Sequence, residues 1–184
     1  MNIFIDIIGS WFVRASMIVV ALTLVVNMND ALYKRSTKAN ARSLHTLVDS
    51  IMYADLSNAC YDIDSSIWRS DNTFQDADPT NMEFWADTSS STARYTIKYF
   101  CNYPNSLGRY SLYRKVNNLS ALLLGDKFTQ VSFKYYDANG DSIVSLPYTK
   151  IRRIRVLLGN AVGNLGTPDS TISSDFTVYP SRLF

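Results

Sequence analysis

Asp6 and Arg14 are the two residues whose positions point most directly to a function. They are the only charges in residues 1–28, which are otherwise almost entirely apolar. An ionisable group in a membrane segment is costly and usually has a partner or a role. Positions 6 and 14 are eight apart, about two helical turns, so they share a face but lie too far apart to pair directly. Two interpretations stay open. Either Asp6 lies at a membrane surface and Arg14 snorkels from a tilted helix, or a neighbouring subunit neutralises Asp6 through its terminal amine or its own Arg14.

Cys60 and Cys101 are the only cysteines. One disulfide between them would tie the end of a predicted helix to a predicted strand at 95–101, and would hold in an oxidising compartment. Two unpaired buried thiols are the alternative. No C-x-x-C or C-x-x-C-H motif occurs, so no redox-active pair or covalent haem is predicted.

Other residue types leave little material for catalysis. His45 is the single histidine, and the sequence has no Gly-rich phosphate loop, G-x-S-x-G motif or recognisable carboxylate pair. We therefore predict no enzymatic activity, metal or cofactor. Residues 137–141 (DANGD) lack the glycine position and closing glutamate of a calcium loop and predict a hairpin turn. Asp71, Asp76 and Asp78 are weak calcium candidates, because three aspartates in a loop are ordinary.

Composition narrows the class of protein further. The chain has 184 residues, of which 47% are hydrophobic and 13% aromatic, with a formal net charge of +2. The aromatic content excludes intrinsic disorder, and the balanced charge gives no sign of a nucleic-acid partner. A soluble cytosolic enzyme fits this composition poorly.

The apolar start of the chain predicts a membrane helix. Residues 7–26 have about the ~20-residue length that crosses a bilayer core. A cleaved signal peptide is the competing interpretation, but the basic start is missing and no Ala-x-Ala type site follows Val26. We expect the helix to be retained.

The helical pattern continues well beyond the membrane segment. Apolar residues recur at steps of three and four, which gives one stripe after residue 42. Its members are Leu44, Leu47, Val48, Ile51, Met52, Leu56 and Ala59. Arg42, Asp49 and Ser50 lie opposite and suit solvent. A helix from Asn2 to about Asn58 is about 85 Å long, and we expect only part of it to pack on the rest of the chain.

A basic run follows the membrane segment, at Lys34, Arg35, Lys38 and Arg42. A solvated helix face near lipid headgroups explains it. By the positive-inside rule, the run would place the C-terminal part in the cytoplasm.

The second half of the sequence predicts strands. Residues 61–93 read as loops with short strands, and period-two alternation then appears at 95–101, 130–135 and 153–158. A return strand is predicted at 142–146, and Phe176 and Val178 mark the last strand. We predict an α+β fold in which a long helix (1–59) precedes an antiparallel β-rich head (60–184). Within the helix, about 2–28 is the membrane part and about 42–59 packs on the head.

The ordered series of these segments resembles type IV pilin-like proteins, in particular the larger minor pilins and minor pseudopilins of type IV pilus and type II secretion systems. The matching segments are 2–8 (NIFIDII), 95–100 (YTIKYF), 112–115 (LYRK), 131–140 (VSFKYYDANG), 151–156 (IRRIRV) and 176–183 (FTVYPSRL). If Met1 were removed, Asp6 would stand fifth, where the family carries an acidic residue that pairs with the terminal amine of an adjacent subunit.

The resemblance implies a filament subunit. Its helix would anchor it in the inner membrane and then pack among identical or related helices. Its head would be extracytoplasmic, in the periplasm or at the cell surface, which conflicts with the positive-inside rule. The alternative is a single-pass anchored module whose aromatic residues recognise a glycan or a protein. Those residues are Trp68, Trp85, Tyr99 and Tyr110.

Overall fold

The computed structural model contains one helix and eight strands in the part of the chain that it describes. The described residues are 2–59, 74–87, 94–144, 151–164 and 167–180. The chain forms two compact units, Met1–Asn40 and Ala41–Phe184. The last turns of the helix therefore belong to the same unit as the strands.

The helix α1 (Asn2–Ser57) is continuous over 56 residues. Its only glycine is Gly9, and the first proline of the chain is Pro79, so no residue type that breaks helices interrupts it. At its end, the amide of Asn58 donates to the carbonyl of Ala54 at 3.2 Å. The predicted helix from Asn2 to about Asn58 is confirmed.

The strands form one antiparallel sheet. Its order is β1-β2-β3-β4-β5-β7-β8, and β6 pairs with β5 outside this path. The strands are β1 (Phe74–Ala77), β2 (Asn81–Asp87), β3 (Arg94–Cys101), β4 (Tyr110–Val116), β5 (Leu122–Tyr136), β6 (Ser142–Ile143), β7 (Arg153–Asn164) and β8 (Thr167–Val178). The predicted α+β class, with a long N-terminal helix before an antiparallel sheet, is confirmed.

Alternation along the strands divides the sheet into an inner and an outer face. Val131, Phe133 and Tyr135 of β5 are buried, whereas Lys134 is exposed. In the adjacent strand β7, Val156 is buried and pairs with Phe133. The period-two pattern thus identified the inner face correctly.

The turn at 137–141 forms as predicted. The amide of Asp137 donates to the carbonyl of Asp141 at 3.0 Å, and Gly140 has a φ of 92°. A side chain at that φ would be strained, which explains the glycine. The return strand β6 ends at Ile143, and the rest of the predicted strand 142–146 lies partly outside the described residues.

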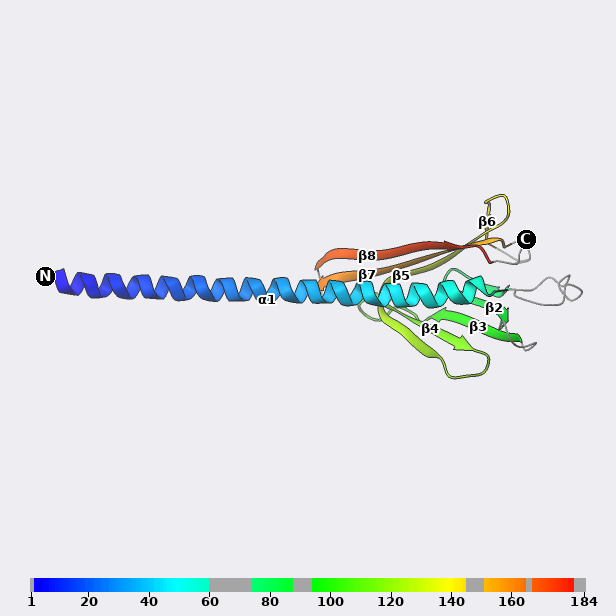
Figure 1. Cartoon of the computed structure of the whole chain (residues 1–184), viewed down its shortest axis with the longest axis horizontal. Helices are drawn as coiled ribbons and strands as arrows, with labels where there is room; N and C mark the ends of the chain where they lie inside the picture. The colour runs from blue at the N-terminus through cyan, green and yellow to red at the C-terminus, as the bar shows by residue number, and fades with distance from the viewer. Residues whose placement is uncertain (1, 60–73, 88–93, 145–150, 165–166, 181–184) are drawn as a thin grey trace, which may run out of the picture. The chain divides into compact units, whose positions relative to one another are not determined.

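The sheet curls round the last turns of α1, with β2 to β4 on one side in the view of Figure 1 and β7 and β8 on the other. Strand β5 joins the two sides, because its first half pairs with β4 and its second half with β7. Val48, Met52 and Leu56 are fully buried. They recur every four residues and form the narrow stripe that faces the sheet. Leu47, which we predicted on this stripe, is 57% exposed, so that part of the prediction is wrong. It lies one residue before Val48, which turns its side chain about 100° away from the buried one.

An ion pair attaches the end of α1 to strands β3 and β4. Arg114 donates from Nε and Nη2 to the two carboxylate oxygens of Asp55, at 2.6 and 3.0 Å. The hydroxyl of the fully buried Tyr99 donates to the same carboxylate. Burial, followed by the charge of Asp55, raises the pKa of Tyr99 above its ordinary value, so the hydroxyl keeps its proton.

A second polar contact attaches α1 to β8. The hydroxyl of Ser174 donates to Asp49 at 2.9 Å, and Nδ1 of His45 lies 3.1 Å from the same hydroxyl oxygen. Because Asp49 accepts the hydroxyl proton, the neutral ring carries its own proton on Nδ1 and donates it to Ser174. Asp49 was predicted to face solvent; the structure instead places it on the head, so this prediction is wrong.

The environment of His45 opposes its protonation. The side chain is 4% exposed, its ring meets Phe128 edge-on at 5.7 Å, and Nε2 is buried without a hydrogen-bond partner. Burial lowers the pKa of His45, although the charge of Asp49 partly counteracts this. Burial also raises the pKa of Asp49, against the hydrogen bond from Ser174.

Replacing Asp55 with Ala should destabilise the full-length chain by about 2–3 kcal/mol, because Arg114 and Tyr99 lose their shared acceptor. The matched control is Asp175→Ala, which breaks the exposed bidentate pair with Arg155 on the outer face. We expect a much smaller change there, because solvent screens the pair. Urea unfolding in detergent, followed by the β-sheet circular dichroism signal, measures both. Equal destabilisation by the two variants would contradict this account.

The stability of the fold should fall as the pH decreases from about 7.5 to about 5.5. The unfolded chain takes up a proton on its histidine near the ordinary pKa of about 6.5, whereas folded His45 does so only at lower pH. The stability from the neutral ring is therefore complete above about pH 6.5 and is lost as the pH falls through the folded pKa. Asp49 acts in the opposite sense, because its raised pKa favours the folded state as the pH falls toward the ordinary aspartate value.

The variant His45→Gln isolates the histidine contribution, since His45 is the only histidine of the chain. Urea midpoints measured across this pH range should decline in the parent and stay nearly level in the variant. A decline of the same size in both would show that another group causes it.

Candidate functional site

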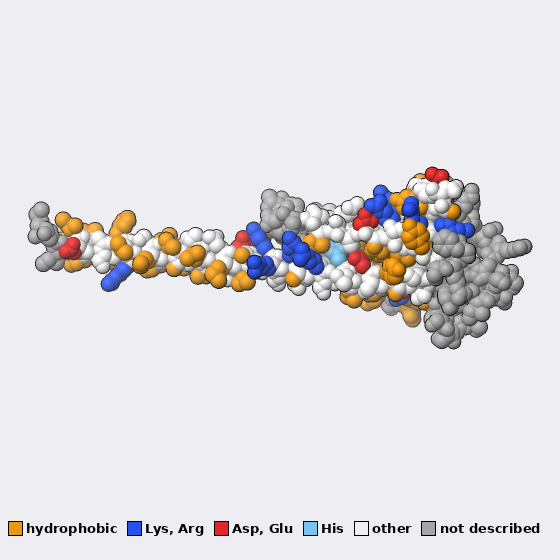
Figure 2. All heavy atoms as spheres, turned by 45° about the horizontal axis from the view of Figure 1, so that its top comes forward, with side chains coloured by type: hydrophobic (Ala, Val, Ile, Leu, Met, Phe, Trp, Pro, Cys, Tyr) orange, Lys and Arg blue, Asp and Glu red, His pale blue; other side chains and the backbone are white. Residues whose placement is uncertain are grey.

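The N-terminal part of α1, from Phe4 to Tyr33, carries a continuous apolar surface that is exposed. Eighteen large hydrophobic side chains between Phe4 and Tyr33 are exposed. Figure 2 shows hydrophobic side chains along this stretch of helix. In the described part of Ala41–Phe184, by contrast, hydrophobic side chains of the helix and the sheet form one shared core. An exposed apolar surface of this extent marks a site of contact with lipid or protein.

Within the described residues, α1 is the helix that is long and apolar enough to cross a membrane. None of its most apolar 18-residue stretch is buried in the structure. This criterion rests on length and composition, so it supports the predicted membrane helix and leaves its orientation open.

Two hydroxyl groups of this stretch are satisfied inside the helix. Ser16 donates to the carbonyl of Val13 at 2.8 Å, and Thr23 donates to the carbonyl of Val19 at 2.8 Å. A donor that already has a backbone acceptor costs less to move into hydrocarbon than a free one. These two polar residues are therefore compatible with an apolar environment.

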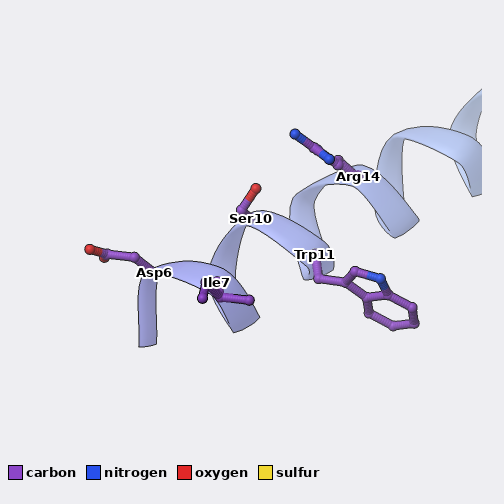
Figure 3. A pocket seen from close by; sticks show the side chains of 5 residues that line it. All are labelled: Asp6, Ile7, Ser10, Trp11 and Arg14. Carbon is purple, nitrogen blue, oxygen red and sulfur yellow. The ribbon is translucent and has the colours of Figure 1, made fainter. Parts of the chain in front are cut away.

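Asp6 and Arg14 lie on one inclined row of the helix, with Ser10 between them. The three residues follow each other at steps of four, and together with Ile7 and Trp11 they line an open groove (Figure 3). In the view of Figure 3, the side chains of Ser10 and Arg14 point upward and that of Trp11 points downward, and all three border the same groove. Ser10 and Trp11 were not among the predicted site residues, although the four-residue spacing from Asp6 to Ser10 to Arg14 indicates that Ser10 shares their row.

No ion pair within the described residues includes Asp6 or Arg14. The structure therefore places both predicted site residues on one exposed surface without joining them.

The basic run lies on an exposed face of α1. Lys34 pairs with Asp30 at 3.2 Å, one turn earlier. Arg35, Lys38 and Arg42 are exposed, and Figure 2 shows Lys and Arg side chains gathered after the apolar stretch. At about 100° per residue, the four cations occupy little more than a quarter of the circumference of the helix.

Only one cysteine of the predicted disulfide lies within the described residues. Cys60 lies outside the described residues, and Cys101 ends β3, partly buried. Burial raises the pKa of the Cys101 thiol to about 12, so the thiol form is strongly favoured at neutral pH. Whether the two residues are bridged stays a prediction.

One aromatic residue of the alternative binding module, Tyr99, is removed from the surface. Tyr99 is fully buried and bonds to Asp55, so it cannot contact a ligand. Trp85 and Tyr110 are partly buried on β2 and β4, and Trp68 lies outside the described residues.

The one cluster that contains serine, histidine and aspartate is arranged as a structural contact. Nucleophilic catalysis needs the histidine between the serine and the carboxylate, so that it can accept the hydroxyl proton. Here Ser174 lies between His45 and Asp49 and gives its proton to Asp49. Among the described residues, no three His, Cys, Asp or Glu side chains come together as a metal site. Of the calcium candidates, Asp71 lies outside the described residues.

Comparisons with known protein families, with curated proteins and with solved structures found no match to this chain. The function must therefore be argued from the residues and their geometry.

Proposed function

We propose that the chain is a structural subunit of a type IV pilus-like or pseudopilus filament. Its apolar helix is stored in the inner membrane and then packs among identical or related helices. The β-rich part lies outside the cytoplasm and forms the exposed surface of the assembly. The observation that carries the proposal is an exposed apolar helix surface with two opposite charges, Asp6 and Arg14, that have no ion-pair partner among the described residues.

The size of the apolar surface requires a cover from outside the chain. Burying one large hydrophobic side chain is worth about 1.5–3 kcal/mol. The eighteen exposed side chains between Phe4 and Tyr33 therefore represent several tens of kcal/mol. A domain is stable by only about 5–15 kcal/mol, so an aqueous state with this surface exposed is strongly disfavoured. Lipid or other apolar helices remove that cost.

The two charges favour helices over lipid as the final cover. In hydrocarbon, each unpaired charge is expensive. In an assembly of parallel helices, Asp6 gains a cation and Arg14 gains an anion without any rearrangement of the subunit. Transfer from lipid to helices brings little hydrophobic gain, so close packing and charge pairing must supply the driving force.

The folded unit Ala41–Phe184 suits an exposed role. It buries its own core, including the last turns of α1, and so does not depend on assembly for its fold. A single-pass anchored binding module is the alternative function, in which lipid remains the permanent cover.

Removal of detergent from the purified full-length chain should produce filaments visible by negative-stain electron microscopy. The variant Val19→Glu should leave the membrane fraction and form no filaments, because it places a charge in the apolar surface. Val144→Glu is the matched control. Val19 and Val144 are 62% and 86% exposed, but Val144 lies beyond β6 in the β-rich unit, so this variant should assemble normally.

A different result would support the anchored module. The chain would then remain as single copies in lipid nanodiscs, form no filaments after detergent removal, and retain its membrane anchoring. The proposal would also be contradicted if the Val19→Glu variant formed as many filaments as the unsubstituted chain.

A further inference from the structure

Asp6 and Arg14 are separated by a fixed distance along the axis of α1. Eight residues of α-helix rise about 12 Å, which is too long for the two side chains to meet within one chain. A second parallel helix that is displaced by the same 12 Å brings its Arg14 level with Asp6 of the first. The two opposite charges then face each other across the helix contact.

We propose that neighbouring copies of this chain pack with an eight-residue stagger, in which Asp6 of one copy pairs with Arg14 of the next. The inference rests on the proposed filament function and specifies its register. Each copy offers Asp6 to one neighbour and Arg14 to another, so the contact is heterologous and repeats without closing. A single pair of residues thus sets both the polarity and the spacing of the assembly.

The shape of the helix at this point suits such a contact. Asp6, Ser10 and Arg14 form a ridge at steps of four, the kind of row that packs into the groove of a neighbouring helix. Ser10 is small and lies between the charges, which permits a close approach. Trp11 lines the same groove, about 100° round the helix from Ser10, and so borders this ridge (Figure 3).

The electrostatics predict a distinctive order among variants. Removing one member of an ion pair in an apolar environment leaves an uncompensated charge, whereas removing both leaves none. Asp6→Ala and Arg14→Ala should therefore each reduce incorporation into filaments on the order of 100-fold. The double variant Asp6→Ala/Arg14→Ala should assemble better than either single variant.

The reversed pair Asp6→Arg/Arg14→Asp keeps the same stagger with the charges exchanged. It should recover incorporation, whereas Asp6→Arg or Arg14→Asp alone should not. Arg35→Ala is the matched control, because Arg35 is an exposed cation of the same helix outside the proposed pair. Membrane fractionation of every variant separates a failure of assembly from a failure of insertion.

Disulfide trapping tests the stagger itself. In a mixture of tagged Val13→Cys and untagged Ala21→Cys full-length chains, the product that joins positions 13 and 21 should dominate, because these positions are again eight apart. Mass spectrometry of the trapped peptides identifies the linkage. In a filament reconstruction, paired copies should be displaced by about 12 Å along the axis.

Two results would overturn the inference while leaving the filament function intact. One is filaments in which the dominant disulfide joins the same position of two chains, 13 with 13 or 21 with 21. The other is filaments that form at the parent level from Asp6→Ala. Absence of filaments from the parent chain would instead reject the proposed function, and the stagger with it.

Discussion

The exposed apolar surface between Phe4 and Tyr33 is the constraint on which the rest of the account depends. The helix that bears it has no proline and one glycine, so it stays regular through this segment. Water is an unsuitable environment for this surface, because the cost of its exposure exceeds the stability of an ordinary domain. The choice of partner is therefore between lipid and other apolar helices. Asp6 and Arg14 favour other helices over lipid, because another protein chain can supply each of them with a fixed opposite charge.

In the unit Ala41–Phe184, the last turns of the same helix are covered by the sheet. From Ala41 onward, the sheet covers the stripe of Val48, Met52 and Leu56, and two polar contacts fix the helix against both halves of the curled sheet. Asp55 is held by Arg114 and Tyr99, and Asp49 by Ser174. Because these bonds are satisfied within the unit, they define one orientation of the helix on the sheet. From Phe4 to Tyr33, by contrast, the large hydrophobic side chains of α1 are exposed.

Elements with strong periodicity could be predicted from the sequence, and contacts between distant elements could not. The long helix and the inner face of β5 follow from spacing alone, because apolar residues recur at four and at two residues. The roles of His45, Asp49 and Asp55 depend on Ser174, Tyr99 and Arg114, which are more than 40 positions away in the sequence. From the sequence alone, charged residues near an amphipathic stripe are predicted to face solvent, because their partners elsewhere in the chain are not known. At the candidate site, Asp6 and Arg14 were visible because a charge in an apolar run is conspicuous, whereas Ser10 is chemically unremarkable.

Spin labelling along α1 tests the central claim most directly. Nitroxide side chains placed one at a time at positions 4 to 33 of the full-length chain report contact with apolar oxygen or with a water-soluble nickel complex. In lipid bilayers, labels at positions 7 to 26 should be accessible to oxygen and protected from nickel. After assembly, labels on the row of Asp6, Ser10 and Arg14 should lose access to both. Labels that remain accessible to nickel along the whole segment, in membranes and after detergent removal, would contradict the account, because the apolar surface would then lie in water.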